Sequence, residues 1–221
     1  MFKGVRCVLF DLDGTLIDSA ADLGGAADEM RVARGLPSLP PSHYRASAGS
    51  GARGMLGVAL GVTPSHADFP ALREEFFDRY EQRMTRLTQP FDGVVLVLQT
   101  LAQSGIHWGV VTNKSRRFVG PLLATMPAFE GASTIVCGDT TAHTKPHPAP
   151  LHEAMRQVGA RPHHCIYVGD DERDMLAGRA AGVATVAARY GYLGPDAVVA
   201  RWPADAVIDF PAELLKLIET A

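Results

Sequence analysis

Short apolar runs recur along the chain and alternate with segments of helical periodicity. Several of the runs are rich in Val and Ile without polar alternation, which is typical of strands covered on both faces. We predict six strands, at residues 5–10, 107–112, 134–137, 165–168, 183–187 and 206–208. The segments between them predict helices at residues 93–104, 115–124, 148–158 and 172–181. This alternation indicates an α/β fold, a three-layer Rossmann-like parallel sheet with helices on both faces.

One long segment interrupts the alternation directly after the first strand. Residues 19–90 contain no convincing strand pattern and are too long for a simple loop. Within them we predict helices at residues 20–34, 41–47, 53–60 and 71–87. We therefore predict a small all-helical domain at residues 19–90, inserted into a core formed by residues 1–18 and 91–221. The linkers between the two should lie near residues 16–19 and 88–92.

Composition narrows the class of protein. The chain has 221 residues, of which 47% are apolar and 20% charged, enough to fold around a sizeable core. Its net charge of −3 does not favour a nucleic acid or a membrane as partner. Asp11 interrupts the first apolar run, so we expect no secretory signal. Three scattered cysteines fit reduced thiols, and we expect a cytoplasmic protein. We expect it to be a monomer or a homodimer.

Polar residues follow the carboxyl ends of four predicted strands, where ligands bind in open α/β sheets. They are Asp11, Asp13, Thr112, Asn113, Lys145, Asp170, Asp171 and Asp174. Several carboxylates at one place are stable only if a cation neutralises them, and oxygen ligands favour Mg²⁺. Thr112 and Lys145 can donate hydrogen bonds to a phosphate. One carboxylate then remains to attack phosphorus and another to move protons.

Four motifs carry a family resemblance. DLDGT, TN, the Lys-Pro pair at 145–146 and GDDERD, in this order on this fold, resemble the signature motifs of the haloacid dehalogenase (HAD) superfamily. The resemblance covers the whole chain and includes a helical cap after the first motif. It implies that Asp11 attacks phosphorus to form an aspartyl phosphate. Asp13 would protonate the leaving oxygen and then activate water. The resemblance as a whole implies a Mg²⁺-dependent phosphatase of small phosphate monoesters.

The same resemblance implies roles for the remaining site residues. The residues that hold the phosphoryl oxygens would be Thr112, Asn113 and Lys145. The Mg²⁺ ligands would be a carboxylate oxygen of Asp11, the backbone carbonyl of Asp13, the side chain of Asp170 and, through water, Asp174. Asp171 occupies a position that is Ser or Thr in many relatives, so its role stays open.

The cap is expected to select the leaving group. Residues 18–23 and 178–183 resemble the phosphoglycolate phosphatase branch, and residues 45–61 and 189–195 resemble bacterial phosphatases of N-acetylmuramic acid 6-phosphate. The turn SAGSGARG at residues 47–54 brings backbone N–H groups close to an anion. Arg45 and Arg53 are candidates to contact a carboxylate, which both substrates carry.

Other functions and other basic residues have competing interpretations. A sugar-phosphate mutase on the same scaffold is one alternative. A signalling receiver domain is another, but the chain length, the insert after the first strand and the presence of Asp13 oppose it. We expect Lys114, Arg116 and Arg117, which follow the TN motif, to be solvated at the start of a helix.

Overall fold

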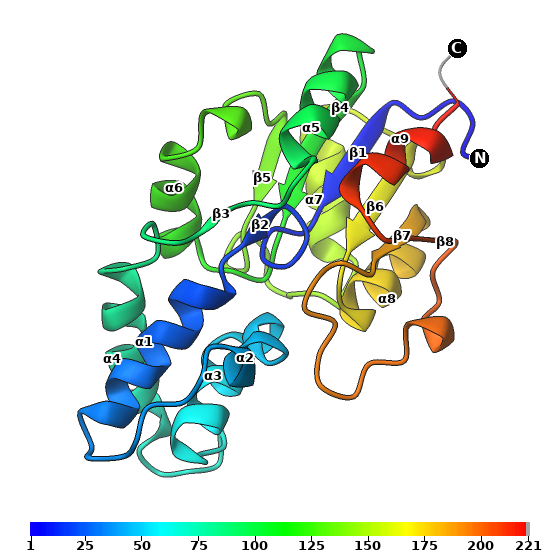
Figure 1. Ribbon diagram of the computed structural model, residues 1–221. Helices are drawn as coiled ribbons and strands as arrows, with labels where there is room; N and C mark the ends of the chain where they lie inside the picture. The colour runs from blue at the N-terminus through cyan, green and yellow to red at the C-terminus, as the bar shows by residue number, and fades with distance from the viewer. Residues whose placement is uncertain (220–221) are drawn as a thin grey trace.

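The computed structural model describes residues 1–219 and has a six-stranded parallel sheet at its centre (Figure 1). The strands are β1 (Cys7–Phe10), β4 (His107–Val111), β5 (Thr134–Val136), β6 (Cys165–Gly169), β7 (Ala184–Ala188) and β8 (Ala206–Ile208). Their order across the sheet is β5-β4-β1-β6-β7-β8. Each predicted strand is confirmed to within two residues at either end.

Helices cover both faces of this sheet, which confirms the predicted three-layer arrangement. The helices of the core are α5 (Val94–Gln103), α6 (Arg116–Ala124), α7 (Ala149–Val158), α8 (Glu172–Ala181) and the short α9 (Leu214–Leu217). Successive side chains of β1 point to opposite faces. Val8 and Phe10 join an apolar cluster that includes α5, whereas Cys7 and Leu9 join a second cluster with α7 and α8. Burial on both sides explains why the strand is apolar at every position.

The insert after β1 is helical, as the sequence predicts. Between the short strands β2 (Ile17–Asp18) and β3 (Gln89–Pro90) lie α1 (Ala20–Val32), α2 (Ser42–Arg45), α3 (Gly51–Leu60) and α4 (Phe69–Glu81). β2 and β3 pair antiparallel, so the two linkers run side by side. Figure 1 shows these helices gathered at one end of the sheet. We call this helical insert the cap.

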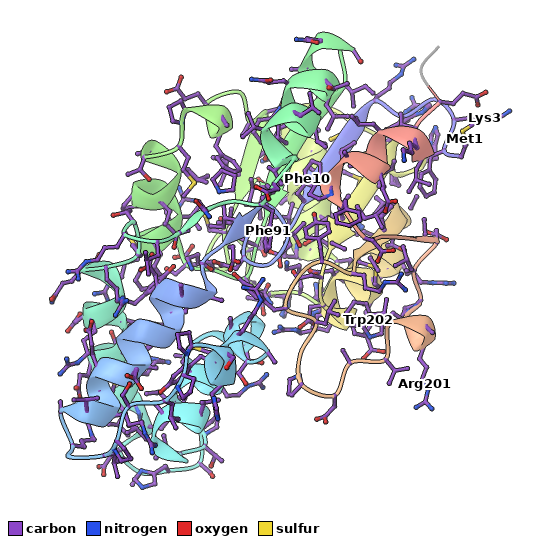
Figure 2. The ribbon with its side chains drawn as sticks, in the orientation of Figure 1. Met1, Lys3, Phe10, Phe91, Arg201 and Trp202 are labelled. Atoms are coloured by element: carbon purple, nitrogen blue, oxygen red, sulfur yellow. The ribbon has the colours of Figure 1, made fainter. Side chains whose placement is uncertain are left out.

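The linkers are anchored by contacts that the sequence pattern did not reveal. Helix α4 ends at Glu81 rather than near residue 87. The carboxylate of Asp22 in α1 accepts hydrogen bonds from the backbone N–H groups of Leu87 and Thr88, both at 2.9 Å. Phe91, directly after β3, packs against the apolar cluster that contains Phe10, near the middle of the molecule (Figure 2). The chain therefore turns back toward the core as soon as α4 has ended.

The chain path places several loop ends at one edge of the sheet. β1 lies between β4 and β6, so the chain crosses to one side of β1 for β4 and β5 and then returns to the other side for β6. The loops that follow β1, β4 and β6 diverge at this point. Such a topological switch is where open α/β sheets bind their ligands.

Two further expectations can be compared with the structure. Within residues 1–219, no helix has the length and apolar character needed to cross a bilayer. Cys7, Cys137 and Cys165 are all buried and form no disulfide in the described part of the chain. The prediction that they are unpaired core thiols is confirmed.

Candidate active site

The loop after β1 brings Asp11 and Asp13 to the edge of the sheet. The backbone N–H of Asp11 donates to the carbonyl of Val168 at 2.9 Å, so Asp11 keeps the register of the sheet beside β6. Gly14 has a φ of 88°, in the left-handed region. A Cβ at this position would also overlap the carboxylate of Asp170. The tight turn of DLDGT therefore requires glycine for its backbone conformation and for the close approach of a carboxylate.

Three carboxylates converge beyond this turn. Asp11, Asp170 and Asp174 each offer an oxygen, and these atoms lie within 4.8 Å of one another. Burial raises the pKa of Asp170 well above its usual value, and repulsion from Asp11 and Asp174 adds to this effect. Burial also raises the pKa of Asp11 to about 6, although Lys145 opposes the shift. Negative charge that the protein alone does not neutralise fits a hard divalent cation with oxygen ligands.

The orientation of Asp170 is fixed by two hydrogen bonds. The hydroxyl of Thr15 donates to Asp170 Oδ1 at 2.9 Å, and the backbone N–H of Tyr192 donates to Oδ2 at 2.8 Å. The Tyr192 hydroxyl accepts hydrogen bonds from the backbone N–H groups of Ser19 and Ala20, at 2.7 and 3.0 Å. Tyr192 thus connects the acidic cluster to the first linker of the cap. No role was predicted for this tyrosine from the sequence.

Lys145 is the cation of the acidic cluster. Its Nζ lies 2.8 Å from Asp11 Oδ1 and 2.7 Å from Asp174 Oδ1, and only 3% of its side chain is exposed. It also donates to the Tyr167 hydroxyl at 2.8 Å. Burial acts to lower the pKa of Lys145, but the attraction of Asp11 and Asp174 outweighs it and raises that pKa. The ammonium group is therefore held charged next to Asp11.

The residues at the end of β4 take two different positions. Thr112 is buried, and its Oγ1 accepts a hydrogen bond from the N–H of Lys114 at 3.1 Å, which leaves its hydroxyl proton to donate to a ligand. Asn113 uses both ends of its amide on the backbone of Lys145. Its Oδ1 accepts from the Lys145 N–H at 2.9 Å, and its Nδ2 donates to the Lys145 carbonyl at 3.0 Å. In this structure Asn113 positions the lysine loop.

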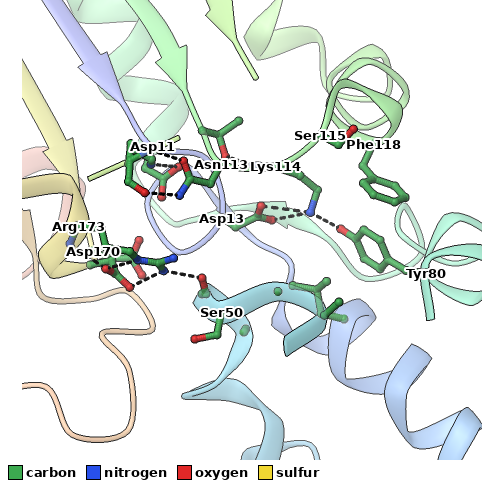
Figure 3. Close-up of a pocket in the computed structure, with 18 of the residues that line it drawn as sticks. Asp11, Asp13, Ser50, Tyr80, Asn113, Lys114, Ser115, Phe118, Asp170 and Arg173 are labelled. Atoms are coloured by element: carbon green, nitrogen blue, oxygen red, sulfur yellow. Dashed lines mark hydrogen bonds and ion pairs between the residues drawn. The ribbon is translucent and has the colours of Figure 1, made fainter. Parts of the chain in front are cut away.

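Lys114 points into the site rather than into solvent, so the expectation of a solvated helix start is wrong for this residue. Its side chain is 8% exposed, and its Nζ lies 3.1 Å from each carboxylate oxygen of Asp13 (Figure 3). It also donates to the hydroxyl of Tyr80, a cap residue, at 2.8 Å. Burial acts to lower the pKa of Lys114, but Asp13 and Tyr80 outweigh it and raise that pKa. Asp13 further accepts a hydrogen bond from the hydroxyl of Ser19.

The two arginines after Lys114 are exposed, as expected. Arg117 nevertheless has partners across the cap boundary. Its Nη2 lies 2.7 Å from Asp78 Oδ1 and 2.7 Å from Glu81 Oε2, both on α4. Because these groups are solvent-exposed, we expect the ion pairs to contribute little to stability.

Asp171, whose role the sequence left open, caps helix α8. Its Oδ1 accepts from the N–H of Arg173 at 2.9 Å, and its own N–H donates to Asp174 Oδ2 at 3.1 Å. Such reciprocal bonds satisfy the free N–H groups at a helix start. Arg173, which the sequence analysis missed, forms an ion pair with Asp171 at 2.7 Å and donates to the carbonyl of Gly49 in the cap at 2.8 Å. Asp171 therefore orients both Asp174 and Arg173.

A cavity of about 290 Å³ separates the sheet edge from the cap. Its core side is lined by all eight polar residues predicted from the strand ends, together with Lys114, Ser115 and Arg173. Its other side consists mostly of apolar side chains and backbone atoms. The residues on that side are Leu23, Ala48, Gly49, Ser50, Gly51, Ala52, Phe76, Phe77, Tyr80 and, from α6, Phe118. The small-residue turn predicted at 47–54 therefore does face the site. Figure 3 shows this loop opposite the aspartates.

The two cap arginines predicted to contact substrate are not brought into this cavity. Neither belongs to the described residues that line it. Arg45 instead forms an ion pair with Asp18 in the linker at 2.8 Å and lies over the ring of Tyr192. Arg53 is exposed on α3. The arginine that does line the cavity is Arg173, which comes from the core.

The chain is similar to known proteins over most of its length. The sequence model of the family described as haloacid dehalogenase-like hydrolase matches residues 8–188. The N-acetylmuramic acid 6-phosphate phosphatase of Pseudomonas aeruginosa is 39% identical over 217 residues, which cover 98% of this chain and 96% of that protein. The phosphoglycolate phosphatase of Xanthomonas campestris is 43% identical over 210 residues, 95% of this chain and 94% of that one.

Solved structures share the whole fold. A crystal structure of a predicted phosphoglycolate phosphatase from Haemophilus somnus superposes with a TM-score of 0.84 at 27% identity. The match covers 96% of this chain and 97% of that chain, so it includes the cap as well as the sheet. The curated relatives and this solved structure each match at least 95% of the chain.

Proposed function

The chain belongs to the haloacid dehalogenase-like hydrolase family, and from this premise we propose that it is a Mg²⁺-dependent phosphatase. Its reaction would transfer the phosphoryl group of a small monoester to Asp11 and then to water. The observation that carries the proposal is the position of Asp11, with the Lys145 ammonium 2.8 Å from one carboxylate oxygen and two further aspartates beside it. The relatives described above are named as phosphatases, which supports the same reaction class.

The donor set suits the metal that the family implies. Asp11, Asp170, the backbone carbonyl of Asp13 and, through water, Asp174 would hold Mg²⁺. The raised pKa values of Asp11 and Asp170 support this assignment, because a bound cation would supply the missing positive charge. When bound, the ion neutralises charge on the phosphoryl oxygens during transfer.

The first chemical step would use Asp11 and Asp13. An oxygen of the Asp11 carboxylate forms a bond to phosphorus while the bond from phosphorus to the leaving oxygen breaks. Asp13, protonated at the start of this step, gives its proton to the leaving oxygen, and the alcohol departs. Lys145 and Thr112 would donate hydrogen bonds to the phosphoryl oxygens, whose charge they stabilise in the transition state.

The second step would return the enzyme to its starting state. Asp13, now a carboxylate, accepts a proton from a water molecule that attacks the phosphorus of the aspartyl phosphate. The Asp11–phosphorus linkage breaks, and inorganic phosphate is released. Both steps require exclusion of other water, and the cap residues over the cavity supply that cover.

The substrate we propose is a carboxylate-bearing phosphate monoester, with N-acetylmuramic acid 6-phosphate as the leading candidate and phosphoglycolate as the other. The apolar cap side of the cavity, with Phe76 and Phe77, favours the sugar, because a sugar ring offers more surface for such contacts than a two-carbon leaving group does. The 39% identity to a phosphatase of that sugar phosphate supports it as well.

A steady-state comparison across phosphate monoesters tests the proposal. Phosphate release is measured with Mg²⁺ for N-acetylmuramic acid 6-phosphate, N-acetylglucosamine 6-phosphate, phosphoglycolate and glucose 6-phosphate. The first two differ by the lactyl group that carries the carboxylate, so the proposal predicts a higher kcat/KM for the muramic acid ester. Equal values for the pair would remove the carboxylate from the substrate assignment. A requirement for a bisphosphate activator with little free phosphate would indicate a mutase, and a single turnover would indicate a receiver domain.

A further inference from the structure

Lys114 is the buried cation of the cavity for which the proposed mechanism has no role. Its ammonium group has three N–H donors, and three acceptors lie around it: Oδ1 and Oδ2 of Asp13, each at 3.1 Å, and the Tyr80 hydroxyl at 2.8 Å. The ring of Tyr80 lies 4.5 Å from Nζ and the ring of Phe118 lies 6.0 Å from it. The ammonium is thus saturated by protein groups and enclosed by aromatic side chains.

The acceptors of Lys114 come from different parts of the chain. Asp13 follows β1 in the core, 101 residues before Lys114, and Tyr80 belongs to α4 of the cap. Tyr80 is itself held firmly, because it is 1% exposed, stacks on Phe76 with a centroid distance of 6.2 Å and meets Phe118 edge-on at 5.4 Å. The position of the Lys114 ammonium therefore depends on the cap being docked against the core.

Asp13 receives a second contact from the first linker of the cap. Ser19, whose hydroxyl donates to Asp13 Oδ1, lies in the linker directly before α1. Among the described residues, the side-chain contacts of Asp13 thus come from Lys114 and from Ser19, which the core residue Tyr192 also holds. A carboxylate held on both oxygens by a lysine is fixed in orientation. A proton-transfer group has to be aligned in this way with the atom that takes its proton.

We propose that Lys114 is a positioning residue for Asp13, and that Tyr80 makes this positioning depend on a docked cap. Lys114 holds the Asp13 carboxyl group toward the leaving oxygen and stabilises the negative charge that Asp13 gains as it gives up its proton. When the cap swings away, Tyr80 leaves Lys114, and Asp13 loses its alignment. This inference rests on the proposed function, because it assigns a partner to the acid of that reaction.

The test uses two substrates of nearly the same shape whose leaving groups differ in their need for a proton. p-Nitrophenol is a much stronger acid than phenol, so p-nitrophenyl phosphate needs little help from a general acid, whereas phenyl phosphate needs much. The quantity measured is the ratio of kcat/KM for p-nitrophenyl phosphate to kcat/KM for phenyl phosphate, with Mg²⁺ present. This ratio reports on the phosphorylation step alone, and uniform damage to the site leaves it unchanged.

We expect Lys114→Met to raise the ratio on the order of 10- to 100-fold, because the acid contributes about 10²- to 10⁴-fold and its alignment only part of that. Asp13→Asn sets the upper limit of the ratio. Tyr80→Phe, which removes only the cap hydroxyl, should raise it about threefold, roughly what one lost hydrogen bond contributes.

Tyr44→Phe is the matched control, since Tyr44 is a buried cap tyrosine whose hydroxyl donates to Asp28 inside the cap. Lys216→Met, at an exposed lysine, is the control for the lysine variant. Both controls should keep the wild-type ratio.

The outcomes separate the inference from the proposal beneath it. If Lys114→Met lowers kcat/KM for both esters by the same factor, Lys114 does not act through Asp13, and the inference is overturned while the phosphatase proposal stands. If Tyr80→Phe keeps the wild-type ratio while Lys114→Met raises it, the part assigned to the cap is overturned. A wild-type protein that releases phosphate from neither ester would contradict the proposed function itself, and the inference with it.

Discussion

The core wall and the cap wall of the cavity are lined by different kinds of residue. On the core wall, charged side chains contact one another directly, as Lys145 does with Asp11 and Asp174. The cap wall consists of aromatic rings, small residues and backbone, with Phe76, Phe77 and the loop 48–52. The core wall can act on the phosphoryl group, which every phosphate monoester has. The cap wall meets only the part that differs between monoesters, so the two walls should separate reaction from selectivity.

A few contacts connect the core to the cap. Lys114 reaches Tyr80, Arg173 reaches the carbonyl of Gly49, and Arg117 pairs with α4. Each of these cations belongs to the core, and each finds its acceptor on the cap. Changes on the core wall are therefore expected to affect all substrates, and changes on the cap wall to affect some substrates more than others.

The largest expected effect is that of Asp11→Asn on the core wall. Asparagine keeps the shape of the side chain but is not a nucleophile, so kcat should fall by at least about 10⁴-fold with every ester. Asp174 remains as a partner for Lys145, and we expect the variant to stay folded. The measurement is phosphate release, with circular dichroism and thermal unfolding as controls. Activity within tenfold of wild type would mean that another residue attacks phosphorus.

Asp13→Asn should cost less, about 10²- to 10⁴-fold in kcat/KM for alkyl esters, because it removes proton transfer and leaves the nucleophile in place. The comparison of walls predicts that this loss is the same for sugar and glycolate esters. A loss confined to one of these substrates would place Asp13 among the selectivity residues. Steady-state kinetics on both esters distinguishes the two cases.

The binding of Mg²⁺ should depend on pH through the core wall alone. The pKa of Asp11 is raised to about 6, so below that pH the carboxyl group is mostly protonated. It must lose this proton to the solvent before it can bind a metal ion. Between pH 7.5 and pH 5 the affinity for Mg²⁺ should fall by about tenfold from Asp11 alone. Titration calorimetry at the two pH values measures this change. An affinity independent of pH would contradict a role for Asp11 as ligand.

The raised pKa of Asp11 also predicts how the stability of the metal-free protein changes with pH. The folded state binds the Asp11 proton more tightly than the unfolded chain, whose aspartates titrate near pH 4. The contribution of this group to the free energy of unfolding is therefore present at low pH and is lost as pH rises from about 4 to about 6. Added Mg²⁺ should accordingly raise the melting temperature more at pH 7.5 than at pH 5.

The smallest expected effect concerns the cap wall. Phe77→Ala removes a partly buried ring that lines the cavity, a loss of about 1 kcal/mol of apolar contact. KM for N-acetylmuramic acid 6-phosphate should rise about fivefold, while kcat/KM for phosphoglycolate, whose leaving group offers far less surface to the ring, should stay near wild type. Equal losses on both esters would break the proposed division between the walls.

The sequence was sufficient to predict the sheet and the eight polar residues that its strand ends bring to the core wall, but not Lys114 or Arg173. Strands buried on both faces leave an uninterrupted apolar pattern, and parallel strands bring their carboxyl ends to one edge, so Asp11, Lys145 and Asp170 could be expected to meet. Contacts set by distant partners left no such pattern. Tyr80 lies 34 residues from Lys114, and the Asp18 partner of Arg45 lies 27 residues away. Asp22, which accepts from the backbone of the segment after α4, lies 65 residues before Leu87.

The central claim is that Asp11 becomes phosphorylated during turnover. The most direct measurement is a single turnover of wild-type enzyme with Mg²⁺ and p-nitrophenyl phosphate, quenched in acid and analysed by peptide mass spectrometry. The account predicts a phosphoryl group on the peptide that contains residue 11, and none on that peptide from Asp11→Asn. A phosphoryl group on any other residue, or full phosphate release by Asp11→Asn, would contradict it.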